Sequence, residues 1–207
     1  MVDLYIWVGI ALLSGSIPWA LLLSKFLSRK DVRLIGDGNP GTANAWKSSG
    51  WIIGLTSLFL EVSKGGIPIY FALNFRGKTL VDLSDIFLTL LLIAPAVGHA
   101  WSPFLKFKGG KALAVSWGAW IVITDGLAFP AALIFLGIMH GIQNNHAITV
   151  TVCLIGLLVV SLPSYQEYFL IWFWAANMIL VMFKHRNEYS QGLLFRDWVR
   201  RLAVKAH

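Results

Sequence analysis

The chain has 207 residues, enough for one domain, and 57% of them are hydrophobic. A mean hydropathy of +0.70 and recurring long apolar runs place that domain in a membrane and exclude a protein that folds in water. The formal net charge of +7 comes from bases that interrupt the apolar runs, and because these bases follow no nucleic-acid-binding motif, we expect no nucleic-acid partner.

Seven apolar runs predict membrane-crossing helices, because every backbone polar group in lipid must be satisfied within its own segment. We therefore expect an all-α fold: a polytopic integral membrane protein with about seven transmembrane helices, in a single membrane domain of residues 1–207. The fourth and fifth runs are short, and only Asp125-Gly126 separates them, so they form either two tilted crossings or one re-entrant hairpin. The expected spans are about 4–24, 51–73, 85–101, 112–124, 127–142, 147–163 and 167–184.

Basic residues predict which helix ends face the cytoplasm. Of the 17 Lys and Arg residues, 14 fall in three segments. These are the loops at about 25–50 and 102–111 and the tail at 185–207, counted together with Lys184 directly before it. An odd number of crossings places these three segments on one side, and only Arg76 and Lys78 fall on the other. We therefore expect the N-terminus outside, the C-terminus in the cytoplasm, and attraction of the cytoplasmic bases to anionic lipid headgroups.

The segment GDGNPGTANAW at 36–46 is polar and rich in glycine, unlike the apolar chain around it. Glycines allow positive φ angles and close backbone approach, and asparagines offer amide donors and acceptors. Arg33 precedes the segment and Lys47 follows it, which adds positive charge. We interpret the segment as one wall of a site for a phosphate-bearing substrate. Its candidate residues are Gly36, Asp37, Gly38, Asn39, Gly41 and Asn44.

The second span contains two charged residues, Glu61 and Lys64, each costing at least ~2.5–3.5 kcal/mol near the centre of a membrane. At positions i and i+3 they share a helix face and can pair. Either they neutralise each other and help pack the bundle, or they face a water-filled pocket, with Gly65 and the following glycine admitting another backbone. His99, at the interfacial end of the third span, is a further candidate, with capping or packing as the alternative.

The stretch KFKGGKA at 106–112 places three lysines around a double glycine, directly before the next apolar run. Free backbone N–H groups, the positive end of a helix dipole and full lysine charges together predict an anion site. The Walker A spacing is absent, and the alternative is a turn whose lysines only set the topology. The residues that we select are Lys108, Gly109, Gly110 and Lys111, with His185 and Asn187 from the sequence KHRNE that follows the last span.

Cys153 is the only cysteine and lies inside a predicted span. It excludes an internal disulfide and a metal site built from cysteines.

The order of these motifs resembles the bacterial acyl-phosphate-dependent glycerol-3-phosphate acyltransferase family, known as PlsY. The resemblance runs from about residue 12 to 188. It implies a seven-helix protein of the inner (plasma) membrane with its active site on the cytoplasmic face. The motifs that carry it are SGSIPWA, GDGNPGTANAW, EVSKGGIP, GHAWSPFLKFKGGKALA and KHRNE.

The resemblance also implies a reaction, in which a fatty acyl group passes from acyl phosphate to the 1-hydroxyl of sn-glycerol 3-phosphate. The products are lysophosphatidic acid and phosphate, in phospholipid biosynthesis. The implied partners are these two substrates and membrane lipids, with no cofactor and no metal. The implied catalytic residues are Lys111, His185 and Asp37, and the implied substrate-binding residues are Gly36, Gly38, Asn39, Gly41, Asn44, Lys47, Lys64, His99, Lys108, Gly109, Gly110 and Asn187.

The chain departs from the family pattern at several of these positions. Asp37 stands where the family has serine and Glu188 where it has asparagine, and both add negative charge where phosphate should bind. Lys47 replaces an arginine and loses its bidentate geometry, and Glu61 replaces an aspartate. Two alternatives therefore stay open: a degenerate family member that binds a phosphorylated or lipid ligand, and a small membrane transporter with a charged relay in its second span.

Overall fold

The computed structural model of the chain describes residues 2–74, 83–163 and 168–205, and the side chains of residues 5–74, 83–163 and 168–201. The described elements are helices. One isolated β-bridge pairs Gln143 with Phe195. The all-α prediction is therefore confirmed. Arg76 and Lys78, which we assigned to the outer side, lie outside the described residues. The elements are α1 (Val2–Ser16), α2 (Trp19–Ser28), η1 (Val32–Leu34), α3 (Thr42–Ser49), α4 (Trp51–Asn74), α5 (Asp85–Ala100), η4 (Pro103–Leu105), α6 (Leu113–Ile123), α7 (Ala128–Ile142), α8 (His146–Ser161), α9 (Tyr168–Tyr189) and α10 (Asp197–Lys205).

Four segments are long and apolar enough to cross a membrane, which supports an integral membrane protein. They are Tyr5–Ser28, Trp51–Asn74, Asp85–Leu105 and Tyr168–Tyr189. The other apolar helices, α6, α7 and α8, have 11, 15 and 16 residues. At 1.5 Å per residue, each is shorter than a ~30 Å hydrocarbon core.

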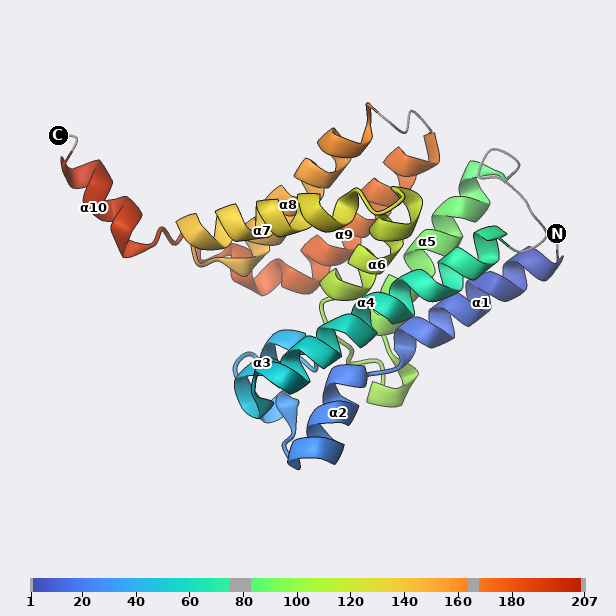
Figure 1. Cartoon of the computed structure of the whole chain (residues 1–207), viewed down its shortest axis with the longest axis horizontal. Coiled ribbons are helices and arrows are strands. Elements are labelled where there is room, and N and C mark those ends of the chain that lie inside the picture. The colour runs from blue at the N-terminus through green and yellow to red at the C-terminus, as the bar shows by residue number, and fades with distance from the viewer. Residues whose placement is uncertain (1, 75–82, 164–167, 206–207) are drawn as a thin grey trace.

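Close backbone contacts between helices hold the bundle together (Figure 1). α1 packs against α4 and α5, and α4 packs against α6. A Cβ atom at Gly65 of α4 would lie 2.0 Å from the carbonyl oxygen of Val115, and one at Gly118 of α6 would lie 2.1 Å from that of Val62. Glycine is therefore required on both sides of this crossing, as small residues are at many membrane helix interfaces.

The first predicted span is two helices, because Pro18 interrupts it. Proline has no N–H and cannot continue the hydrogen-bond ladder. The backbone groups freed by the break find charged partners on α4: Lys64 Nζ donates to Ile17 O at 2.5 Å, and the N–H of Ala20 donates to Glu61 Oε1 at 3.3 Å. The buried charges of the second span thus have a structural role at the α1–α2 break.

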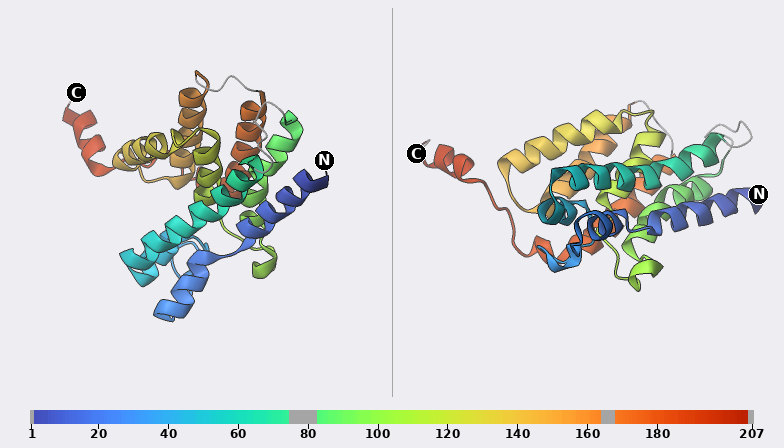
Figure 2. Two further views of the ribbon diagram at one scale, coloured as in Figure 1. Left: turned by 45° about the vertical axis from the view of Figure 1, so that its right-hand side comes forward. Right: turned by 60° about the horizontal axis from the view of Figure 1, so that its bottom comes forward.

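All three segments that we expected to be loop or tail contain regular structure, since the 102–111 loop includes η4. The 25–50 segment includes the end of α2, the short helix η1 and all of α3. α9 continues to Tyr189, so the sequence KHRNE at 184–188 is helical. Figure 2 shows α2 and α3 at the same end of the bundle, near the start of α4.

Candidate active site

The double-glycine turn meets the 36–44 loop at Gly110. The N–H of Gly110 donates to the carbonyl oxygen of His99 at 3.2 Å. A Cβ atom at Gly110 would lie 2.2 Å from His99 Nε2 and 3.0 Å from Asn39 Oδ1. Gly109 is equally confined, since its Cβ would lie 1.9 Å from the His99 carbonyl oxygen. The end of α5 and the 36–44 loop therefore leave no room for a side chain at either glycine while the turn keeps this position.

Lys111 follows this turn and lies between two carboxylates. Its Nζ donates to Asp37 Oδ2 at 2.5 Å and to the carboxylate of Glu188 on α9. The other oxygen of Asp37 accepts from Asn44 Nδ2 at 2.9 Å and from the N–H of Asn39 at 3.2 Å. The two residues that added negative charge to the sequence motif thus contact the same lysine.

These contacts set the charges of Asp37 and Lys111. Burial acts to raise the pKa of the Asp37 carboxyl, but the hydrogen bonds from Lys111, Asn39 and Asn44 outweigh it and lower that pKa to about 2. Burial acts to lower the pKa of Lys111, and its hydrogen bonds to Asp37 and Glu188 outweigh this effect and raise it. Asp37 is therefore an anion and Lys111 a cation at neutral pH. Because the Asp37 side chain is 48% exposed, the pair adds little to stability.

His185 and Glu188 form a second pair, one turn apart on α9. His185 Nδ1 lies 3.2 Å from Glu188 Oε2. The imidazole is buried, and its Nε2 has no hydrogen-bond partner among the described residues. A histidine oriented through Nδ1 by a carboxylate, with a free Nε2, is the arrangement of a general base.

The side chain of Asn145 links the start of α8 to the end of α9 by hydrogen bonds. Its Nδ2 donates to the carbonyl oxygens of Glu188 at 2.9 Å and Gly192 at 2.7 Å. Its Oδ1 accepts from the N–H of Ile148 and so caps α8. The sequence NNHAIT at 144–149 therefore supplies, through Asn145, a hydrogen bond to the last turn of α9, which carries Glu188.

Behind the double-glycine turn lies a buried cluster of Glu61, Lys64 and His99. Lys64 Nζ is 2.6 Å from Glu61 Oε2 and 3.0 Å from His99 Nδ1, and His99 Nδ1 is 3.1 Å from Glu61 Oε2. All three side chains are enclosed by protein. This geometry favours our packing alternative for the charged pair, and it fixes the imidazole against which Gly110 rests.

The remaining candidates surround the site less closely. Lys47, Lys108 and Asn187 are exposed, and their own side chains make no hydrogen bond to another described residue. Lys47 lies within electrostatic range of His146, as do Lys111 and Glu188, so α3 and the start of α8 face the same region. Among the described residues no three His, Cys, Asp or Glu side chains are grouped so that they could hold a metal ion.

Three residues of the site were absent from our list of binding and catalytic candidates: Glu188, Glu61 and Asn145. The i, i+3 spacing of His185 and Glu188 could have indicated their pairing, had the helix been extended past its predicted end. The sequence carries no comparable signal for the contact between Asn145 and α9.

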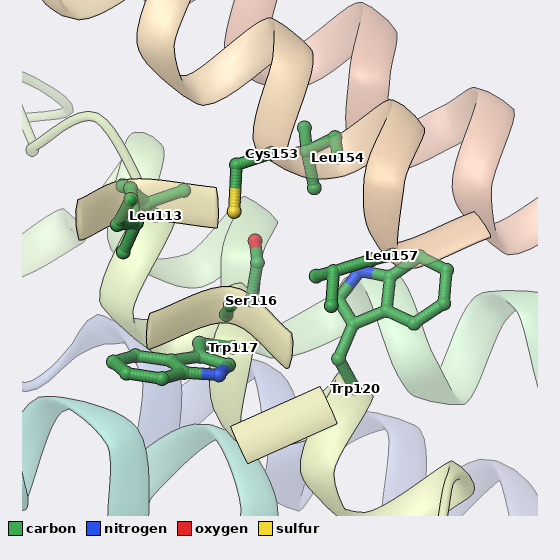
Figure 3. A pocket seen from close by; sticks show the side chains of 9 residues that line it. Leu113, Ser116, Trp117, Trp120, Cys153, Leu154 and Leu157 are labelled. Carbon is green, nitrogen blue, oxygen red and sulfur yellow. The ribbon is translucent and has the colours of Figure 1, made fainter. Parts of the chain in front are cut away.

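An apolar pocket begins two residues beyond Lys111, at Leu113. Figure 3 shows Cys153 and Leu154 of α8 facing Leu113 and Ser116 of α6 across it. Its lining comes from α6, α7 and α8: Leu113, Ser116, Trp117, Trp120, Ala132, Leu136, Cys153, Leu154 and Leu157.

Comparison with known proteins reveals close similarity to one family. Residues 5–193 match the family model described as glycerol-3-phosphate acyltransferase. Glycerol-3-phosphate acyltransferase 1 of Thermotoga maritima is 31% identical over 200 residues, which cover 90% of this chain and 96% of the relative. The glycerol-3-phosphate acyltransferase of Endomicrobium trichonymphae is 32% identical, with 88% of each chain covered.

Two solved structures share the fold. One is a crystal structure of PlsY, an integral membrane glycerol 3-phosphate acyltransferase, in its glycerol 3-phosphate form; it superposes with a TM-score of 0.79 at 25% identity and covers 91% of each chain. A crystal structure of the lysophosphatidic acid form superposes with a TM-score of 0.78 at 24% identity. Both agree with the helical architecture described above.

Proposed function

From the premise that this chain belongs to the glycerol-3-phosphate acyltransferase family, we propose that it transfers a fatty acyl group from acyl phosphate to the 1-hydroxyl of sn-glycerol 3-phosphate. The products are lysophosphatidic acid and phosphate. The observation that carries the proposal is the meeting of the double-glycine turn and the 36–44 loop at Lys111. This meeting unites the two segments in which the sequence concentrates anion-binding chemistry.

Lys111 is the central phosphate-binding charge of the site. Asp37 and Glu188 hold its ammonium group in place before substrate arrives. An entering phosphate offers a higher negative charge than either carboxylate and takes over one of these contacts. Lys47 and Lys108 add positive charge from the rim, and the backbone N–H groups of the two glycine-rich segments complete the site. The candidates from the 36–44 loop, Gly36, Gly38, Asn39, Gly41 and Asn44, form its wall.

His185 acts as the general base. Glu188 accepts a hydrogen bond from Nδ1–H, so the unpaired Nε2 is the nitrogen that takes the proton from the 1-hydroxyl. The hydroxyl oxygen then attacks the acyl carbonyl carbon, a new carbon–oxygen bond forms, and the carbon–oxygen bond to phosphate breaks. The proton on Nε2 passes to the departing phosphate. Because a mixed anhydride is already activated, proximity and charge stabilisation supply much of the remaining barrier reduction.

The acyl chain lies between helices, with its terminal methyl group at the apolar pocket of α6, α7 and α8, a small cavity of about 20 Å³. Leu113 lines this pocket only two residues from Lys111, which lets one donor molecule contact both. Lys64 and His99 act from behind the double-glycine turn and position it.

The membrane topology that we propose has seven crossings within one domain, in the inner membrane. The N-terminus is outside, and the site and C-terminus face the cytoplasm. The four long apolar segments supply four crossings, and short crossings by α6, α7 and α8 through locally thinned lipid supply three. The basic loops and tail support this orientation.

The test uses purified protein with palmitoyl phosphate and glycerol 3-phosphate, and measures lysophosphatidic acid formation and phosphate release. His185→Gln is expected to lower kcat by roughly 10²- to 10⁴-fold, the usual contribution of a general base. Lys25→Gln removes an exposed base on α2 and serves as the matched control. Palmitoyl-CoA replaces palmitoyl phosphate in a parallel reaction, in which we expect no product. Unchanged kcat in His185→Gln would refute the general base, and product from the thioester alone would refute the proposed donor.

A further inference from the structure

The helix α10 lies beyond the part of the chain that matches the family model, which ends at residue 193. Figures 1 and 2 show it standing away from the helix bundle in every view. Arg196 precedes it, and Arg200 and Arg201 are both exposed on it. Trp198 is 52% exposed. The proposed reaction does not use any of these side chains.

The base of α10 is firmly attached to the connection between α7 and α8. The N–H of Arg196 donates to Ile142 O at 2.9 Å, and Arg196 Nε donates to His140 O at 2.5 Å. Trp198 Nε1 donates to Gly141 O at 2.7 Å. These contacts fix where α10 emerges, at the end of the bundle where α7 ends and α8 begins.

The attachment leaves an amphipathic surface without protein cover. The indole N–H of Trp198 is satisfied while most of its ring stays exposed, and Leu193 and Phe195 are exposed just before it. No ion pair joins Arg200 or Arg201 to another residue within the described part of the chain. Aromatic rings beside arginines suit the headgroup region of a bilayer, where rings sit at the interface and bases bind anionic lipids.

We propose that α10 lies on the anionic surface of the membrane in which the protein is embedded. Trp198 sits at headgroup level, and Arg200 and Arg201 bind lipid phosphates. We take the bilayer surface to be what covers the exposed face of α10, because the exposed charges are positive and the membrane-crossing helices already hold the protein beside that surface. The segment 196–205 contains four basic residues and one acidic residue, Asp197, so its net charge is positive.

The experiment places a fluorescent probe on α10 of the full-length protein. Cys153→Ala removes the only native thiol, and Val199→Cys provides a labelling site for an environment-sensitive dye. The labelled protein is reconstituted in nanodiscs of phosphatidylcholine and in nanodiscs where phosphatidylglycerol replaces part of that lipid. We expect a blue shift with the anionic lipid, weakened in high salt because the charges are screened.

Two variants make the test specific. Arg200→Gln with Arg201→Gln should lower the ratio of bound to free α10 by about 25-fold, at roughly five-fold per arginine. Arg200→Lys with Arg201→Lys keeps the charge and should retain the shift. A shift of the same size in both lipids, or one unaffected by the glutamine variant, would overturn the proposal. Acyl transfer in detergent, measured in parallel, should be unaltered by either variant.

Discussion

Replacing Gly110 with alanine should damage catalysis while leaving the fold intact. The new Cβ would lie 2.2 Å from His99 Nε2, whereas ordinary contacts begin at 3.4 Å, so one of the two must move by about 1 Å. His99 is held in place by Glu61 and Lys64, at 3.1 Å and 3.0 Å from its Nδ1. The double-glycine turn therefore moves and carries Lys111 with it. A misplacement of ~1 Å costs on the order of 10²-fold in rate, and we expect that loss in kcat/KM.

The assay is steady-state phosphate release from palmitoyl phosphate and glycerol 3-phosphate, with thermal unfolding in detergent as the check on folding. Gly137→Ala on α7 is the matched control, because nothing lies within 4 Å of its added Cβ. The control should keep its activity, and its unfolding temperature should not fall, because alanine favours a helix more than glycine does. If Gly110→Ala retained the kcat/KM of the parent protein, His99 would not be the rigid wall that the structure indicates.

Three further predictions concern the buried cluster, the loop and the pocket. Glu61→Gln leaves Lys64 buried without its counter-charge and should lower the free energy of unfolding by roughly 3–5 kcal/mol. If the variant unfolded at the same temperature as the parent protein, Glu61 would not be the counter-charge that stabilises Lys64. The pKa of Asp37 is lowered to about 2 from an ordinary value of 3.8, so its small stabilising effect is present above the ordinary value and is lost as pH falls through about 2. The free energies of unfolding of Asp37→Asn and of the parent protein, measured by denaturant titration, should therefore converge as pH falls from 3.8 to about 2. A difference that stays constant over this range would exclude the lowered pKa. Cys153→Val fills the small apolar pocket and should raise KM for long-chain acyl phosphates more than for short ones. Equal effects on both would place the chain elsewhere.

The meeting of the two anion-binding segments could be predicted from the sequence because it depends on charge and topology. The 36–44 loop and the double-glycine turn both carry bases, and bases gather on one side of a membrane protein. The glycines around position 110 already implied close backbone approach. The structure adds that Asp37 points at Lys111.

The roles of α9 and of the second span depended on three-dimensional information. Hydropathy ends the last span near residue 184, but α9 continues to Tyr189, and Asn145 binds the carbonyl oxygen of Glu188 in its last turn. That continuation brings Glu188 to Lys111 and leaves Asn187 exposed. The pairing of Glu61 and Lys64 followed from their spacing, whereas their contacts with the α1–α2 break required knowledge of which helices are neighbours.

The most direct test of the function is lysophosphatidic acid formation from labelled glycerol 3-phosphate and palmitoyl phosphate, comparing the purified parent protein with Lys111→Ala. We predict product and stoichiometric phosphate release from the parent protein, and neither from a folded Lys111→Ala variant. Absence of product from the parent protein with both substrates in excess, or equal rates from the two proteins, would contradict a phosphate site centred on Lys111.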